Sequence, residues 1–554
     1  MMDAHQCARN QLGKMVNIST EGGAVAFVDL WKCYDINPYH PYVSASLVSA
    51  VVVSFSIIFV AFRWKWRSSS VAKSSRPPLK RSVSNTSSLM ASMCIPKRHN
   101  MPDPIINIFI EFAQCPTEED MMNLVVAKLL QYERLATIPV VDQQEQLSFH
   151  QMPFDTQKLV RRILVNNNTK ECEPLHKVAE RHLHDPLDDP KGRGKLPWWE
   201  ILLLDNQGTG NSACIWRIHH ALGDGISLAT VGQQILEYAD GSPMTSVIPK
   251  GMMEKRGKPQ MALPSLAGKL LTAAIQVLTM PHTWSDDPTV FSKAMGTNMV
   301  HNHDREIVLF PTLPLDFVKA IKNAAKVSIN DVLFTCLSQA IRDYLDEQDC
   351  PVIKEQGANL LCRALIAAVL PRTVSNAAVD TLKNKWFFLS SDLGVGVSPD
   401  KNDILERLQY LHNHLSSLKT SPVPMVGLAM QNHLAPYTPR ALSEYLFWNT
   451  LSKRSVSISN VPGPAKTCMF AGQPGIGCNM FLSNIMPHVA FISYAGQISG
   501  NITLDPSAVP NCQSLSRHLH NAVVTLAERL DVPVPKEVLL PPKVDGPGSN
   551  AEAQ

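Results

Sequence analysis

The clearest hydrophobic pattern in the chain predicts a strand, a tight turn and a helix. Residues 215–218 are largely apolar, as is typical of a buried strand, and residues 228–238 repeat their apolar positions at helical spacing. Two glycines lie between these runs, and glycine allows a bend that a Cβ atom would obstruct. The sequence therefore predicts that His219 and His220 lie at the rigid end of a strand.

The two adjacent histidines are the first candidate for chemistry. Consecutive strand residues point to opposite faces, so only one of the pair can face a given cavity. Neutral imidazole can accept a proton near neutral pH and return it to a leaving group, which suits a general base. Asp224 can fold back across the turn and hold the loop. The alternative is a packing histidine, which is common for a lone histidine but leaves the second histidine, the aspartate and the glycines unexplained.

The longest apolar run, residues 42–62, contains no charged residue and predicts a transmembrane helix. Its length suffices for a hydrocarbon core of roughly 30 Å, and it starts too late for an ordinary signal peptide. A buried core helix is the alternative. Basic residues and tryptophans alternate in residues 63–67, and a positive flank stays cytosolic. We therefore expect a single-pass membrane protein with a lumenal N-terminus and most of the chain in the cytosol. The expected membrane is that of the endoplasmic reticulum, or alternatively the plasma membrane.

The pattern also divides the rest of the chain. Residues 105–112 predict a strand and residues 117–135 a helix with acidic residues in its first turn. Residues 264–281 predict an amphipathic helix that packs on the core or, alternatively, lies on a bilayer surface. The expected segments are a lumenal N-terminal segment (1–41), the transmembrane helix (42–62), a basic Ser/Pro-rich tether (63–100), an N-terminal half (101–284), a polar linker (285–304), a C-terminal half (305–535) and a disordered tail (536–554).

Composition narrows the function classes. The chain has 554 residues, 45% of them hydrophobic, which is enough for a large core in two domains. Its net charge of +3 forms no broad basic field, so we expect no nucleic-acid partner. The 12 cysteines lack metal-ligand spacing and predict reduced thiols. His182 and His184 have no third ligand nearby, so no metal site is expected.

Several motifs together resemble one family. His219-His220-x-x-x-Asp224-Gly225 resembles the HHxxxDG signature of the wax ester synthase/acyl-CoA:diacylglycerol acyltransferase family. The resemblance extends over roughly residues 100–535, in the family's order. The further matching motifs are Pro197-Trp198-Trp199-Glu200, in which Trp198 replaces a leucine, Asn330-Asp331, and Ser459-Asn460-Val461-Pro462-Gly463-Pro464.

The resemblance implies both a fold and a reaction. The fold would be α/β, with two halves of the chloramphenicol acetyltransferase/condensation-domain type around a central channel. The reaction would transfer a fatty acyl group from acyl-CoA to the hydroxyl of diacylglycerol or of a long-chain alcohol, with no bound cofactor and with membrane lipid as a partner. The alternative function is a non-catalytic, membrane-tethered lipid-binding protein with a degenerate acyltransferase fold.

The resemblance also implies roles for single residues. His220 would be the general base, His219 would act through packing, and Asp224 would hold the loop. Backbone N–H groups near Gly225 or in the Asn460 loop are the candidate donors to the oxyanion. The residues expected to bind substrate are Gly225, Asn330, Asp331, Ser459, Asn460 and Gly463.

Overall fold

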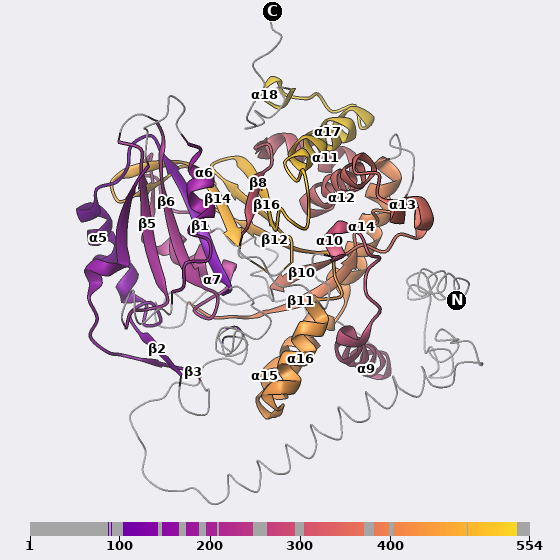
Figure 1. Ribbon diagram of the computed structural model, residues 1–554, viewed down its shortest axis with the longest axis horizontal. Helices are drawn as coiled ribbons and strands as arrows, with labels where there is room; N and C mark the ends of the chain where they lie inside the picture. Colours follow the sequence, from indigo (N-terminus) through magenta and orange to yellow (C-terminus); the bar gives the residue numbers. More distant parts are fainter. Residues whose placement is uncertain are drawn as a thin grey trace, which may run out of the picture.

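Two seven-stranded β-sheets organise the part of the chain that the computed structural model describes (Figure 1). The strand orders are β4-β5-β6-β1-β14-β13-β7 and β11-β10-β12-β15-β16-β8, with β9 paired to β16 in the second sheet. The described residues are 87, 90, 103–141, 147–165, 173–187, 195–207, 210–246, 263–293, 304–369, 382–397, 404–482, 484 and 486–539.

The first sheet has a fully buried centre. Every residue of its neighbouring strands β5 and β6 is buried, which explains their nearly continuous apolar sequence. Its strands are β1 (Ile105–Phe112), β4 (Val160–Leu164), β5 (Trp199–Asp205), β6 (Ser212–His219), β7 (Glu237–Tyr238), β13 (Cys468–Phe470) and β14 (Gln473–Leu482). The surrounding elements are α5 (Glu118–Ala127), α6 (Leu175–Glu180), α7 (Gly225–Ile235), the 3₁₀ turns Leu129–Gln131 and Thr156–Leu159, and the small sheet of β2 (Ile138–Val141) and β3 (Leu147–His150).

The second sheet carries most of the helices. Its strands are β8 (Glu306–Leu309), β9 (Leu313–Pro314), β10 (Arg363–Val369), β11 (Trp386–Asp392), β12 (Val456–Pro462), β15 (His488–Tyr494) and β16 (Gln497–Leu504). The helices are α9 (Leu263–Thr279), α10 (Val290–Lys293), α11 (Leu315–Ala325), α12 (Ile329–Glu347), α13 (Pro351–Gln356), α14 (Ile404–Thr420), α15 (Val423–His433), α16 (Arg440–Leu451), α17 (Ser514–Arg529) and α18 (Lys536–Leu539), with 3₁₀ turns at Met280–His282, Gly357–Asn359 and Ala435–Tyr437.

The two faces of the second sheet have different partners. In β15, Val489 and Phe491 belong to the large core under α12, α14 and α17. Their neighbours Ala490 and Ile492 belong instead to the core of the first half. Because strand residues alternate between faces, one face of this sheet is covered by its own helices and the other faces the N-terminal half.

The chain crosses between the halves late in the sequence. Strand β14 pairs antiparallel with β1, with Phe109 opposite Asn479 at the centre of the register. Residues 473–482 therefore extend the first sheet although they follow most of the second half in sequence. The two halves are joined by strand pairing as well as by side-chain packing.

Most of the expected elements are present. The predicted α/β fold with two sheet-containing halves is confirmed. The helix expected over residues 117–135 is shorter, because α5 ends at Ala127 and a 3₁₀ turn follows. The helix expected over 264–281 corresponds to α9, which packs against α15 and leaves Leu271 56% exposed.

The localisation requires a correction. Among the described residues, no helix is both long enough and apolar enough to cross a bilayer. The expectation of a single-pass membrane protein of the endoplasmic reticulum or plasma membrane is contradicted by this finding. The span expected at residues 42–62 itself lies outside the described residues, as do the segments 1–41 and 540–554.

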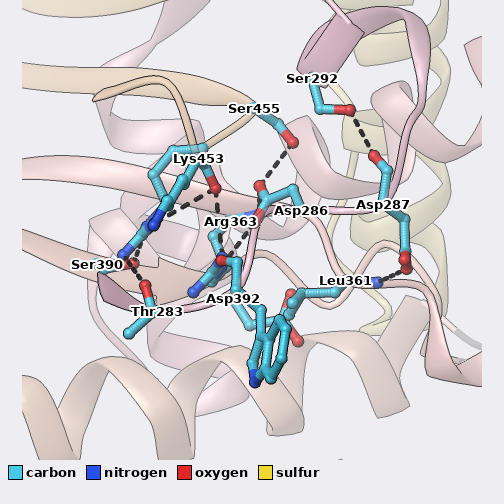
Figure 2. Close-up of polar contacts among 12 residues, drawn as sticks. Thr283, Asp286, Asp287, Ser292, Leu361, Arg363, Ser390, Asp392, Lys453 and Ser455 are labelled. Atoms are coloured by element: carbon cyan, nitrogen blue, oxygen red, sulfur yellow. Dashed lines mark hydrogen bonds and ion pairs between the residues drawn. The ribbon is translucent and has the colours of Figure 1, made fainter. Parts of the chain in front are cut away.

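The described part of the expected linker is packed into the C-terminal half (Figure 2). Asp286 and Asp287 are only 6% and 8% exposed, because their carboxylates bind groups of the second half. Asp286 pairs with the Arg363 guanidinium at 2.6 Å and accepts a hydrogen bond from the Ser455 hydroxyl at 2.7 Å. Asp287 accepts one from the backbone N–H of Leu361 at 2.7 Å. This stretch is a buried anchor, so its polar residues do not indicate a solvated linker.

Removing the anchor carboxylate tests this description. Asp286→Ala is expected to lower the free energy of unfolding by about 3–5 kcal/mol, since it leaves the largely buried Arg363 without its carboxylate. The control is Lys354→Ala, which breaks an exposed pair with Asp349 and should cost at most about 1 kcal/mol. Urea unfolding of both variants provides the comparison. Equal midpoints would contradict a stabilising role for the anchor.

Candidate active site

Strand β6 holds the two histidines at a rigid position. His219 is its last residue and pairs with Ile105 of β1. The backbone N–H of His219 donates to the carbonyl of Trp198 at 2.9 Å, and that of His220 donates to Pro104 at 2.8 Å. Both histidines are thus fixed by neighbouring strands before the chain turns into α7.

His219 is a packed residue. Its side chain is 2% exposed, and its ring lies 4.6 Å from the ring of Trp198. Nδ1 accepts a hydrogen bond from the backbone N–H of Ala221 at 3.1 Å. Burial, with a smaller contribution from the charge of His220, lowers the pKa of His219 to about 3. The residue is therefore neutral, and one ring nitrogen is occupied by the turn.

His220 has the properties of a proton acceptor. Its side chain is partly accessible, its ring lies 5.6 Å from that of Trp386, and its buried Nδ1 has no hydrogen-bond partner among the described residues. Burial lowers the pKa of His220, while the charge of Asp224 and a hydrogen bond with Asn384 act in the opposite direction. The imidazole is thus neutral at pH 7 and can take up a proton.

Asp224 connects the histidine turn to the second half. Its carboxylate caps α7, accepting a hydrogen bond from the backbone N–H of Ser227 at 2.9 Å. The other carboxylate oxygen accepts one from the backbone N–H of Lys385, also at 2.9 Å. The Ser227 hydroxyl adds a bond of 2.6 Å to the carbonyl of Lys383. One buried carboxylate and its Ser227 partner therefore fix the histidine turn to residues 383–385.

The start of β11 and the residues just before it supply two side chains that the sequence did not identify, Trp386 and Asn384. The Asn384 amide donates to the carbonyl of His220 at 2.7 Å, and its oxygen accepts a hydrogen bond from the Trp386 indole at 3.3 Å. Trp386 in turn packs on the His220 ring. Nothing in the local sequence marks these residues, because they reach His220 only through the tertiary contact at Asp224.

The expected substrate-binding residues do not all lie at one place. Gly225 and Ser459 lie where the halves meet: a Cβ on Gly225 would be 3.1 Å from Val461 of β12, and Ser459 is on the sheet face that points to the N-terminal half. Asn460 points to the opposite face, where its amide donates to the Asn330 oxygen at 2.7 Å. At Gly463, a Cβ would lie 2.2 Å from the Ser493 carbonyl, so only glycine fits that turn.

Asp331 is occupied by structural contacts. It forms a capping box with Ser328 at the start of α12 and accepts a hydrogen bond from His412 at 2.9 Å. Burial alone raises the pKa of Asp331, but the hydrogen bonds of His412 and Ser328 and the charge of Lys419 hold it below its usual value. These contacts join α12 to α14.

A third histidine, His488, was not considered in the sequence analysis. It begins β15, is 2% exposed and lies near enough to His220 that the charge of His220 contributes to lowering its pKa. Burial is the larger cause, and together they lower the pKa of His488 to about 3. The only signal in the sequence is the alternation of His488 with Ala490 and Ile492, which places the histidine on one face of an apolar strand.

Comparison with known proteins supports a relationship over most of the described chain. The wax ester synthase/diacylglycerol acyltransferase catalytic domain matches residues 128–333, and the C-terminal domain of the same family matches residues 384–527. A Mycobacterium tuberculosis protein assigned as a diacylglycerol O-acyltransferase is 26% identical over 357 residues, which are 60% of this chain and 74% of that protein. Wax ester synthase/diacylglycerol acyltransferase 11 of Arabidopsis thaliana is 23% identical over 412 residues, which cover 67% of this chain and 82% of that protein.

Solved structures show the same fold. The wax ester synthase/diacylglycerol acyltransferase of Marinobacter aquaeolei superposes with a TM-score of 0.52 at 18% identity, covering 81% of this chain and 98% of that one. A trichothecene 15-O-acetyltransferase of Fusarium sporotrichioides gives a TM-score of 0.51 at 11% identity, and the match covers 81% of this chain and 95% of that one. At these identities the likeness concerns the fold alone.

The contact at Asp224 can be tested separately from chemistry. Asp224→Asn places an amide where two backbone N–H groups now meet carboxylate oxygens, so one donor loses its acceptor. We expect a loss of about 1–3 kcal/mol in stability, as for a buried donor without a partner. Thermal melting measures it, with Asp316→Asn, whose side chain is 93% exposed, as the control. An unchanged melting temperature for Asp224→Asn would contradict the connecting role.

Proposed function

Because this chain belongs to the wax ester synthase/diacylglycerol acyltransferase family, we propose that it transfers a fatty acyl group from acyl-CoA to a lipid hydroxyl. The acceptor is diacylglycerol or a long-chain alcohol, the two classes that the relatives' names describe. One observation carries the proposal: His220 is a neutral, partly accessible imidazole that Asp224 and Asn384 hold at the junction of the two halves. The reaction needs acyl-CoA as co-substrate and no further cofactor.

In the proposed mechanism His220 is the general base. A ring nitrogen of His220 takes the proton of the acceptor hydroxyl as the oxygen attacks the thioester carbonyl. The tetrahedral intermediate collapses, the carbon–sulfur bond breaks, and the imidazolium returns the proton to the coenzyme A thiolate. The products are an ester and free coenzyme A. Transfer is direct, so no acyl-enzyme forms.

Apolar side chains beside His220 support a lipid substrate. The Trp386 ring lies 4.7 Å from that of Phe388, which lies 6.4 Å from that of Phe447. This aromatic row starts at His220 and runs along β11 towards α16. An alkyl chain that packs against this row would remove apolar surface from water, which is favourable by roughly 25 cal/mol per Å² of surface removed.

The remaining roles follow from the contacts. Asp224 orients the turn, and His219 supports it through Trp198 and the N–H of Ala221. The backbone N–H of Gly225 is a candidate donor to the oxyanion. A non-catalytic lipid-binding role is disfavoured, because the histidine pair, the aspartate and the glycine are all retained.

The roles of the two histidines can be separated by mutation. His220→Ala removes the base and should lower kcat by a factor on the order of 10²–10⁴. His219→Ala removes the ring contact with Trp198 and the acceptor of the Ala221 N–H, so it should reduce kcat less, with a lower melting temperature. The measurement is ester formation per folded protein, using labelled acyl-CoA with diacylglycerol and hexadecanol in parallel. A folded His220→Ala variant with near-normal transfer would refute the assignment of the base.

The pH dependence gives a second test. The base must be unprotonated, and its pKa lies below the usual value of about 6.5. Since protonation then occurs only at lower pH, kcat/KM should stay nearly constant from pH 8 to pH 7, and its inflection should lie below pH 6.5. Melting at each pH separates titration from unfolding. An inflection of kcat/KM at or above pH 7 would contradict a lowered pKa of His220.

A further inference from the structure

His488 differs from the other buried histidines that the structure describes. The ring of His219 accepts the N–H of Ala221, and the ring of His520 contacts the carbonyl of Val538. Both ring nitrogens of His488 are buried and have no hydrogen-bond partner within the described part of the chain. A buried polar group without a partner costs free energy, so its retention calls for an explanation.

The strand register shows where His488 points. His488 is opposite Ser457 of β12 and Thr503 of β16, so the three side chains share one sheet face. The Thr503 hydroxyl is also buried and without a partner among the described residues. Further along the same face, Ala490 and Ile492 pack in the core of the N-terminal half. His488 therefore points from the second sheet towards the half that carries His220.

The two histidines lie close enough to interact electrostatically. The charge of His220 is one of the causes that lower the pKa of His488, the larger cause being burial. His488 is consequently neutral near pH 7, with one N–H donor and one acceptor nitrogen. A neutral imidazole can polarise a carbonyl oxygen without placing a second positive charge beside the imidazolium that forms at His220.

We propose that His488 is a second catalytic residue, whose ring N–H donates a hydrogen bond to the thioester carbonyl oxygen as that oxygen becomes an oxyanion. The proposal rests on the acyl-transfer function proposed above. His488 forms and breaks no covalent bond: His220 moves the proton, coenzyme A leaves as before, and His488 stabilises the charge between these steps. The N-terminal half thus provides the base and the C-terminal half a donor to the oxyanion.

The test compares two replacements at this position. His488→Ala removes the donor and should lower kcat by a factor on the order of 10²–10³, with KM for acyl-CoA changed much less. His488→Gln keeps an N–H donor of similar reach, so its kcat should be at least ten times that of His488→Ala. His520→Ala, a buried histidine on α17 outside the site, is the matched control and should retain kcat.

Each outcome distinguishes the two proposals. If His220→Ala is inactive while folded His488→Ala keeps kcat within about threefold of the wild type, the role of His488 is refuted and the acyl-transfer function stands. If His488→Ala and His488→Gln lose the same activity and melt equally early, His488 is a packing residue and the inference fails. If the wild-type protein esterifies neither diacylglycerol nor hexadecanol, the proposed function itself fails.

Discussion

The arrangement of the site depends on the buried carboxylate of Asp224, because each of its two oxygens accepts a hydrogen bond from a different part of the chain. Asp224 caps α7 through Ser227 and binds the backbone N–H of Lys385 with its other oxygen. The turn after the histidines and the segment before β11 therefore cannot move independently. This contact brings Asn384 to the His220 carbonyl and Trp386 to its ring. The signature aspartate thus acts by joining two distant parts of the chain, and its contacts assign it no proton transfer.

Burial then determines the chemistry that the site can perform. Desolvation disfavours the charged form of imidazole, so His219, His220 and His488 all have lowered pKa values. Three neutral histidines in one region have different uses because their partners differ. His219 is bound to its own turn, whereas His220 and His488 keep nitrogens without protein partners within the described residues. His219 supports the turn, and for the other two we propose roles in acyl transfer.

The sequence predicts the local secondary structure, but it does not predict contacts between residues that are distant in the chain. The strand, turn and helix around His220 follow from hydrophobic periodicity and from the glycines, and they are present as β6 and α7. The helix expected over residues 228–238 begins and ends three residues earlier, and Glu237–Tyr238 form β7. The pairing of β14 with β1 joins residues more than 350 positions apart, and no local pattern encodes it. The position of His488 depends on the register of β15, and the buried contacts of Asp286 depend on Arg363. Asp331 resembled a site residue by motif, but its carboxylate is bound to Ser328 and His412.

The central claim is that His220 meets the acceptor hydroxyl at the junction of the two halves. A crystal structure with a non-reactive thioether analogue of acyl-CoA and a long-chain alcohol tests it most directly. We expect the alcohol oxygen to lie about 2.6–3.2 Å from a ring nitrogen of His220, within hydrogen-bond reach of the base. The alkyl chain should lie along Trp386 and Phe388. An alcohol bound away from His220, with the analogue in place, would contradict the account.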